Sequence, residues 1–157
     1  MSQPFTALHS TSHRPDSGRM WETTAQGTVR VGTDLMSVSE VASSIDRFGD
    51  RYLRRVFTPA ELAACAGPSG PSAARLAARF AAKECAVKIL HPIDGVNFHD
   101  IEVQTDRDGR PSIAFHGTMA DRARALGIVD ASLSLSEERG LATAILVAVI
   151  APAPRLR

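Results

Sequence analysis

The chain contains few of the residues that build disulfide-linked or metal–sulfur proteins. Its 157 residues include two cysteines, one tryptophan and one tyrosine. Two cysteines are too few for a disulfide framework, and Cys65 and Cys85 lack the spacing of a metal-binding pair. Cys85 lies in an alanine-rich segment, where we expect it to be a small buried side chain. This sparing use of cysteine fits a reducing compartment, so we expect a cytoplasmic protein.

Strong net charge and long apolar runs are also missing. The formal net charge is +1, so no overall field predicts binding to nucleic acid or to a membrane. The apolar segment 141–151 is about half the length that a membrane span requires. Residues 1–27 show no signal-peptide pattern and are rich in Ser, Thr and Gln, which predicts a flexible extension. We expect one domain at 28–157, long enough to bury its own core.

Several catalytic motifs are absent as well. The sequence has no Walker loop, GxGxxG, CxxC, HExxH or nucleophile elbow. What it has is a series of helical and extended patterns. We predict strands at 28–35, 100–104, 112–115, 131–136 and 141–150, and helices at 37–48, 58–64, 73–90 and from a capping box at Thr118 to Gly127. Helices and antiparallel strands are segregated along the chain, which indicates an α+β fold.

The longest predicted helix has the composition of a central element. Seven alanines between Ala73 and Ala86 favour a slim helix that can approach its neighbours closely. Phe80, Glu84 and Lys88 follow at intervals of four and therefore share one face. This row fits either an ordinary surface ion pair or the wall of a charged site.

A second carboxylate falls near the end of the first predicted strand. Asp34 lies beside Gly32, where another group can approach the backbone closely. Carboxylates brought together repel each other unless a cation lies between them, and Mg²⁺ binds through one or two carboxylates plus substrate phosphates. If Asp34 and Glu84 meet, with Lys88 close by, they predict Mg²⁺-assisted transfer of a phosphate-containing group. A helix cap at Asp34 and a surface ion pair on the helix are the alternatives.

A local basic patch follows the predicted helix 37–48. It consists of four arginines within nine residues, Arg47, Arg51, Arg54 and Arg55. In a nearly neutral protein, such a patch is either a solvated face or a docking surface for an acidic partner.

Three segments together resemble the holo-acyl-carrier-protein synthase family, the small 4′-phosphopantetheinyl transferases. They read VGTDL at 31–35, RVFTPAEL at 55–62 and RFAAKECAVK at 79–88. DIEV at 100–103, DGRP at 108–111 and SLS at 134–136 follow in the family's order. The resemblance covers residues 29–150, and the RFAAKE…K segment is its most specific part.

The resemblance implies a fold, a reaction and a set of site residues. The fold would be an antiparallel sheet with a long central helix, assembled as a trimer that holds the nucleotide between subunits. The enzyme would move the 4′-phosphopantetheine arm of coenzyme A to a serine of a carrier protein. Asp34 and Glu84 match the family's Mg²⁺ ligands, and Lys88 matches its active-site lysine. The coenzyme A contacts would be Arg79, Lys83, Gly109, Pro111, Ser136 and Glu137. The four arginines of the patch would bind the carrier.

The sequence departs from the family at two of these positions. Glu137 stands where relatives usually have histidine, and it places an anion beside a polyphosphate. Arg139, His91 or a shifted metal position could compensate for that charge. Glu40 stands near a position where relatives often carry a carrier-binding arginine. A degenerate member that binds coenzyme A or a carrier without efficient transfer is therefore the alternative to an active transferase.

Overall fold

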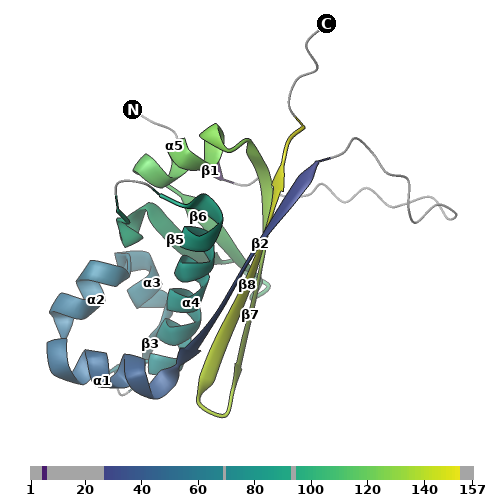
Figure 1. Cartoon of the computed structure of the whole chain (residues 1–157). Helices are drawn as coiled ribbons and strands as arrows, with labels where there is room; N and C mark the ends of the chain where they lie inside the picture. The colour runs from purple at the N-terminus through teal and green to yellow at the C-terminus, as the bar shows by residue number, and fades with distance from the viewer. Residues whose placement is uncertain (1–4, 7–26, 69, 93–94, 153–157) are drawn as a thin grey trace, which may run out of the picture.

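A three-stranded antiparallel sheet lies at one side of the computed structural model, which describes residues 5–6, 27–68, 70–92 and 95–152 (Figure 1). Its order is β2-β8-β7, with β2 at Thr28–Ser37, β7 at Ile128–Glu138 and β8 at Leu141–Ile150. β2 pairs with β8 along its whole length, and Asp34 lies opposite Ala144. Leu135 of β7 is on the other side of Ala144, so Asp34 and Leu135 are separated by two strand spacings, about 10 Å.

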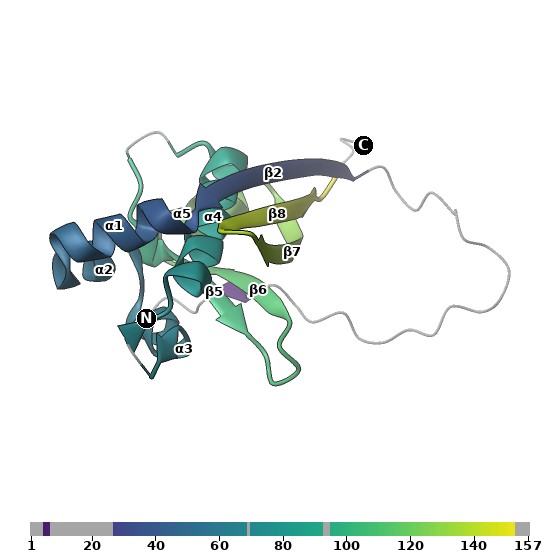
Figure 2. The same ribbon diagram turned by 90° about the horizontal axis from the view of Figure 1, so that it is seen from below.

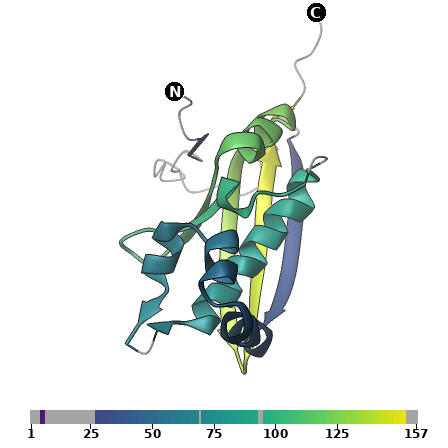
Figure 3. The same ribbon diagram turned by 90° about the vertical axis from the view of Figure 1, so that its left-hand side faces the viewer.

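The long helix α4, Ala73–Leu90, packs against one face of this sheet (Figure 3). Ser72 caps it by accepting a hydrogen bond from the Arg75 amide. Its residues Ala81, Ala82 and Ala86 are buried in one cluster with the strand residues Ala144 and Leu146. The helix lies so close to β2 that a Cβ on Gly32 would be 2.4 Å from the Cys85 carbonyl oxygen. The alanine-rich composition therefore does what the sequence predicts: it brings α4 against the strand that carries Asp34.

Three short helices connect β2 to α4. They are α1 at Val38–Phe48, α2 at Asp50–Val56 and α3 at Pro59–Ala64. Ser37 caps α1, and a complete capping box formed by Thr58 and Glu61 begins α3. After α3, the two-residue strands β3 (Ala66–Gly67) and β4 (Gly70–Pro71) pair with each other. The basic patch of four arginines lies on α1 and α2.

A second hairpin lies on the other side of α4 from β2 (Figure 2). It consists of β5 at Ile101–Thr105 and β6 at Pro111–Phe115, preceded by the 3-10 turn η1 at Phe98–Asp100. Within the predicted N-terminal extension, β1 at Phe5–Thr6 pairs antiparallel with β6. This part of the extension is therefore in a strand. Residues 1–4 and 7–26 lie outside the described residues.

The predicted capping box at Thr118 is wrong. Helix α5 spans Gly117–Ala125 with His116 at its N-cap and no side-chain cap. The Thr118 amide and hydroxyl instead donate to Asp100 Oδ2, at 3.2 and 3.0 Å. A carboxylate that is distant in sequence thus satisfies the helix terminus, a contact that no local pattern contains.

The last hairpin also differs from the prediction. β7 continues through Glu138, and the turn is reduced to Arg139 and Gly140, both with positive φ. β8 is not buried on both faces: its α4 side is buried, whereas Leu141 and Ile145 on the opposite side are exposed. Val31 and Leu35 of β2 share this outer face and are 59% and 62% exposed. In the described ranges, no helix is long and apolar enough to cross a membrane.

We expect Gly32→Ala to separate β2 from α4. The added methyl group would meet backbone atoms of Cys85, which cannot swing aside as a flexible side chain can. Overpacking of this kind costs about 1–3 kcal/mol, and here it would also move Asp34 away from α4. Urea unfolding should report the loss of stability. Gly140→Ala is the control for an added methyl group, because its position is open although its positive φ adds strain. Equal stability of Gly32→Ala and the wild type would contradict the close approach.

Candidate active site

Asp34 and Lys88 form the centre of a polar cluster between β2 and α4. Lys88 Nζ lies 2.7 Å from Asp34 Oδ1 and donates a second hydrogen bond to the Thr33 carbonyl oxygen at 2.6 Å. The Asp34 side chain is only 16% exposed, whereas that of Lys88 is 50% exposed. The bond to Asp34 raises the pKa of Lys88, so its ammonium is charged at neutral pH. The predicted Lys88 thus belongs to a tertiary contact with β2.

Glu84 lies one turn before Lys88 on the same side of α4. Burial, and then the charge of Asp34, raise its pKa, while Lys88 lowers it. The charge of Asp34 therefore acts on the Glu84 carboxylate. An additional cation between them would relieve both the desolvation and the repulsion.

This pair of carboxylates fits a hard divalent cation. Asp34 Oδ2 is buried and has no hydrogen-bond partner among the described residues, so it is available as an oxygen ligand. The described part of the chain contains no group of three or more potential metal-ligating side chains. Two carboxylates completed by substrate phosphates and water are the usual coordination of Mg²⁺ in phosphoryl-transfer sites.

Lys83 does not lie at a ligand surface, contrary to the prediction. Its side chain is 0% exposed, and its ammonium contacts Glu61 Oε2 at 2.8 Å and two carbonyl oxygens, those of Phe98 and Ile101. Burial lowers its pKa, and Glu61 opposes this shift. All three ammonium hydrogens are thus used inside the protein.

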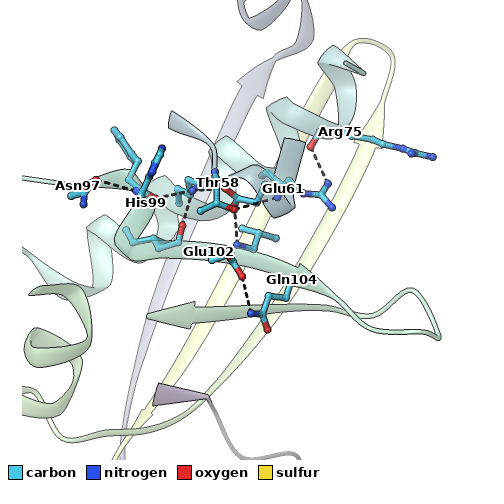
Figure 4. Close-up of polar contacts among 12 residues, drawn as sticks. Thr58, Glu61, Arg75, Asn97, His99, Glu102 and Gln104 are labelled. Atoms are coloured by element: carbon cyan, nitrogen blue, oxygen red, sulfur yellow. Dashed lines mark hydrogen bonds and ion pairs between the residues drawn. The ribbon is translucent and has the colours of Figure 1, made fainter. Parts of the chain in front are cut away.

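Glu61 connects this lysine to two further elements. Its carboxylate accepts hydrogen bonds from the Thr58 amide in the α3 cap and from the Val103 amide in β5 (Figure 4). The pair therefore ties α3, α4, η1 and β5 together. In the sequence, Lys83 and Lys88 are both charged residues of the same helix. The packing buries Lys83 in the interior and places Lys88 at the site.

Arg79 lies on a different face of α4. Nine residues separate it from Lys88, roughly two and a half helical turns, so the two side chains point in opposite directions. Arg79 is 7% exposed and reaches Thr105 Oγ1 at 3.4 Å, but its Nε has no partner among the described residues. With Arg75, Thr105 and Asp106 it lines a groove of about 450 Å³.

The other residues expected to contact coenzyme A lie on the β5–β6 hairpin and on β7. Gly109 lies in the Asp106–Arg110 turn of the β5–β6 hairpin, and Pro111 begins β6. Glu137 is exposed on β7 and, like Arg75 and Arg79, acts electrostatically on Cys65, whose pKa is raised mainly by burial. Ser136 faces the outer side of the sheet in a hollow of about 320 Å³ with Leu35 and Thr143.

Neither residue expected to offset the charge of Glu137 forms an ion pair with it in the described part of the chain. Arg139 pairs with Glu138 at 3.4 Å. His91 is the left-handed C-cap of α4, at the opposite end of that helix from Arg75 and Arg79. Glu137 and these two arginines all act electrostatically on Cys65. Glu40 is exposed in the first turn of α1.

The basic patch is solvent-exposed at all four arginines. Arg54 pairs with Asp50 on its own helix, and Arg47 lies over the Phe48 ring at 5.0 Å. Phe48 is 50% exposed at the end of α1 and is an apolar member of the patch that the sequence prediction did not include.

The predicted site residues therefore form two groups on different faces of α4. Lys88 contacts Asp34 at β2 and Glu84 lies one turn before Lys88, whereas Arg79 lies toward the β5–β6 hairpin. The prediction also missed two backbone oxygens in the first group: the Thr33 carbonyl accepts from Lys88, and the Asp34 carbonyl accepts from the Thr143 hydroxyl. Every residue has a backbone carbonyl, so the residue types in a sequence do not reveal which carbonyl oxygens belong to a site.

These features define a class of small proteins in which one helix, packed against an antiparallel sheet, carries a carboxylate and a lysine toward a strand aspartate. Comparisons with known proteins identify that class. The family model of the 4′-phosphopantetheinyl transferase superfamily matches residues 30–144. The chain is 45% identical to the holo-[acyl-carrier-protein] synthase of Halorhodospira halophila over 76% of its own length and 95% of that protein.

Solved structures agree with this assignment. The holo-[acyl-carrier-protein] synthase of Neisseria meningitidis superposes with a TM-score of 0.66 and is 33% identical, over 75% of this chain and 95% of that one. The Helicobacter pylori enzyme, in complex with coenzyme A, gives a TM-score of 0.66 at 26% identity, over 76% and 99%. The chain belongs to the 4′-phosphopantetheinyl transferase superfamily.

Proposed function

We propose that this transferase depends on Mg²⁺ and works as a homotrimer whose sites are shared between subunits. As a member of its family, it transfers the 4′-phosphopantetheine arm of coenzyme A to a serine of an apo carrier protein and releases adenosine 3′,5′-bisphosphate. The observation that supports the proposal is the cluster of Asp34, Glu84 and Lys88 between β2 and α4.

Each member of this cluster has a distinct proposed role. Asp34 and Glu84 would hold Mg²⁺, which offsets the charge of the pyrophosphate and of the leaving phosphate when it is bound. Lys88 presents a charged ammonium beside them. From there it would stabilise phosphate oxygens, or accept the serine proton through a water molecule once a change in its surroundings allows it to deprotonate.

A second group of residues would complete the coenzyme A site from a neighbouring subunit. Arg79, Gly109, Pro111, Ser136 and Glu137 are the proposed contacts, and Lys83 is left out because its ammonium is buried. Within one chain, Arg79 and Lys88 lie on opposite faces of α4. The exposed apolar outer face of the sheet, Val29, Val31, Leu35, Leu141 and Ile145, offers a surface for other copies.

Mixed trimers test the shared site. Glu84→Gln and Arg79→Ala, each expected to be inactive alone, are co-expressed with different tags and purified through both. In a closed ring, every mixed trimer contains one interface with both intact residues, so about one third of the wild-type rate should return. A mass about three times the 16.8 kDa chain is the accompanying expectation. Mixed trimers that stay inactive would place each site within one chain.

The carrier is proposed to dock on α1 and α2. Four exposed arginines, Arg47, Arg51, Arg54 and Arg55, fit an acidic helix of the carrier, and Phe48 adds an apolar contact among them. An exposed aromatic side chain in such a patch is the type of residue that anchors an interface.

We expect Phe48→Ala to raise the KM for the carrier about 10-fold, because truncating an aromatic anchor commonly costs more than 1 kcal/mol. The KM for coenzyme A should not change. Initial rates at varied carrier concentration give both values. Val129→Ala, at an equally exposed position (50%) on β7, is the control. If both variants raise the carrier KM alike, Phe48 is not a specific contact.

The transfer assay separates this function from the degenerate alternative. Protein, Mg²⁺ and coenzyme A are incubated with apo carriers of fatty acid, polyketide and peptide synthesis, and the carrier's mass is measured. We expect the mass of at least one carrier to increase by that of the 4′-phosphopantetheine arm. We expect Glu137 and Glu40 to influence which carrier is modified. Coenzyme A binding without transfer to any carrier, by a folded trimer, would support the alternative.

We further propose that residues 28–157 form a single transferase domain, with residues 1–27 as an N-terminal extension, and that the protein acts in the cytoplasm. Its two cysteines are free and buried, which fits a reducing compartment. The modified carrier protein that it produces would serve fatty acid or polyketide synthesis.

A further inference from the structure

We infer that Lys88 acts as an internal counter-ion of Asp34 when no substrate is bound, so that the protein takes up its divalent cation and coenzyme A cooperatively. This inference rests on the proposed Mg²⁺-dependent function. It concerns the order in which the site fills, whereas the family assignment concerns the reaction.

The geometry makes Lys88 a competitor for the metal-binding carboxylate. Its Nζ lies 2.7 Å from Asp34 Oδ1 and is held there by a second bond to the Thr33 carbonyl. A cation placed between Asp34 and Glu84 would meet this ammonium at close range. Two positive charges on one carboxylate repel each other, so Lys88 weakens the binding of a cation that arrives alone.

Lys88 is also free to leave. Its side chain is half-exposed, and the lysine stem is flexible, so the ammonium can swing from Asp34 to a new partner. The pyrophosphate of coenzyme A is such a partner, because it is anionic. When Lys88 turns to the pyrophosphate, Oδ1 of Asp34 is released beside Oδ2, which already lacks a partner among the described residues.

Thermodynamic linkage then requires a reciprocal effect. If coenzyme A draws Lys88 away and thereby strengthens metal binding, the metal must strengthen coenzyme A binding by the same factor. Removal of the ammonium should leave the metal site permanently available and reduce the coupling.

The experiment measures Mn²⁺ binding by electron paramagnetic resonance, with the full chain and without carrier, so that no transfer occurs. Wild type, Lys88→Met and Lys88→Arg are titrated with and without saturating coenzyme A. Without coenzyme A, we expect Lys88→Met to bind Mn²⁺ about 10-fold more tightly than the wild type. Lys88→Arg, which keeps the charge, should resemble the wild type. Coenzyme A should tighten Mn²⁺ binding about 10-fold in the wild type and clearly less in Lys88→Met.

Equal Mn²⁺ affinities of wild type and Lys88→Met without coenzyme A would overturn the inference. So would a coupling factor that is unchanged in Lys88→Met. Asp34→Asn separates this from failure of the proposed metal site: if it binds Mn²⁺ as the wild type does, the metal lies elsewhere and the proposed function is wrong. Should Lys88→Met not fold, as judged by circular dichroism, Lys88→Gln takes its place.

Discussion

Glu84→Gln is expected to lower kcat/KM for arm transfer about a thousandfold, because the amide is a poorer metal ligand and carries no charge. Such a loss corresponds to about 4 kcal/mol of transition-state stabilisation, within the range that a metal ion provides. The loss should not be restored by millimolar Mg²⁺. Initial rates with a transferable carrier, over a range of Mg²⁺ concentrations, measure it. A fully active variant would remove Glu84 as a ligand.

The loss of activity in Glu84→Gln should not be caused by a loss of stability. Burial and Asp34 raise the pKa of Glu84, so the ionised carboxylate destabilises the folded chain in the absence of metal. Glu84→Gln should therefore be at least as stable as the wild type at pH 7. Any advantage should shrink as the pH falls through the raised pKa, where Glu84 is protonated. Urea unfolding at several pH values, in the presence of a metal chelator, tests the direction of this pH dependence. Glu102→Gln, an exchange on β5 outside the cluster, is the matched control.

Lys83→Met is expected to cost about 3–5 kcal/mol of unfolding free energy, the largest effect on stability that we predict. It leaves the Glu61 carboxylate buried and without its ammonium partner. Removing one partner of a buried ion pair costs far more stability than replacing both partners by apolar residues. Urea unfolding measures the loss. Lys88→Met, on the same helix but half-exposed, is the control and should change stability much less.

The double variant Lys83→Met/Glu61→Gln gives a sharper test of this pair. Glu61→Gln removes the charge that the first substitution leaves uncompensated, and its amide oxygen can still accept from a backbone amide. The double variant should therefore recover part of the stability lost by Lys83→Met. If the two losses simply add, the contact between Lys83 and Glu61 does not act as a coupled ion pair.

Local patterns were sufficient for most elements. The alanine-rich run ends where Pro92 follows, and the structure places α4 at Ala73–Leu90. The Thr58 capping box is present in full. Lys88 contacts Asp34, because Gly32 and the alanines of α4 allow the helix and the strand to pack closely. The resemblance to the family, which the comparisons confirm, connects this cluster to a reaction.

Tertiary contacts decided what these patterns could not. The prediction of a capping box at Thr118 was wrong, because Asp100, which is distant in the chain, accepts the hydrogen bond of the Thr118 amide. The sequence predicts β8 as a strand, but its hydrophobicity alone does not distinguish burial within a chain from burial against another copy. Its outer face is exposed in one chain.

The sequence by itself determined most of the elements and the family, and it selected the three residues of the proposed metal site. These depend on side-chain type and spacing, which are local properties. Only the tertiary structure decided that Lys83 is buried on Glu61 while Lys88 lies on Asp34, and that Arg79 is on another face of α4. The physical reason is that a lysine or an arginine takes its role from the desolvation and the acceptors around it, and these come from residues far away in the chain.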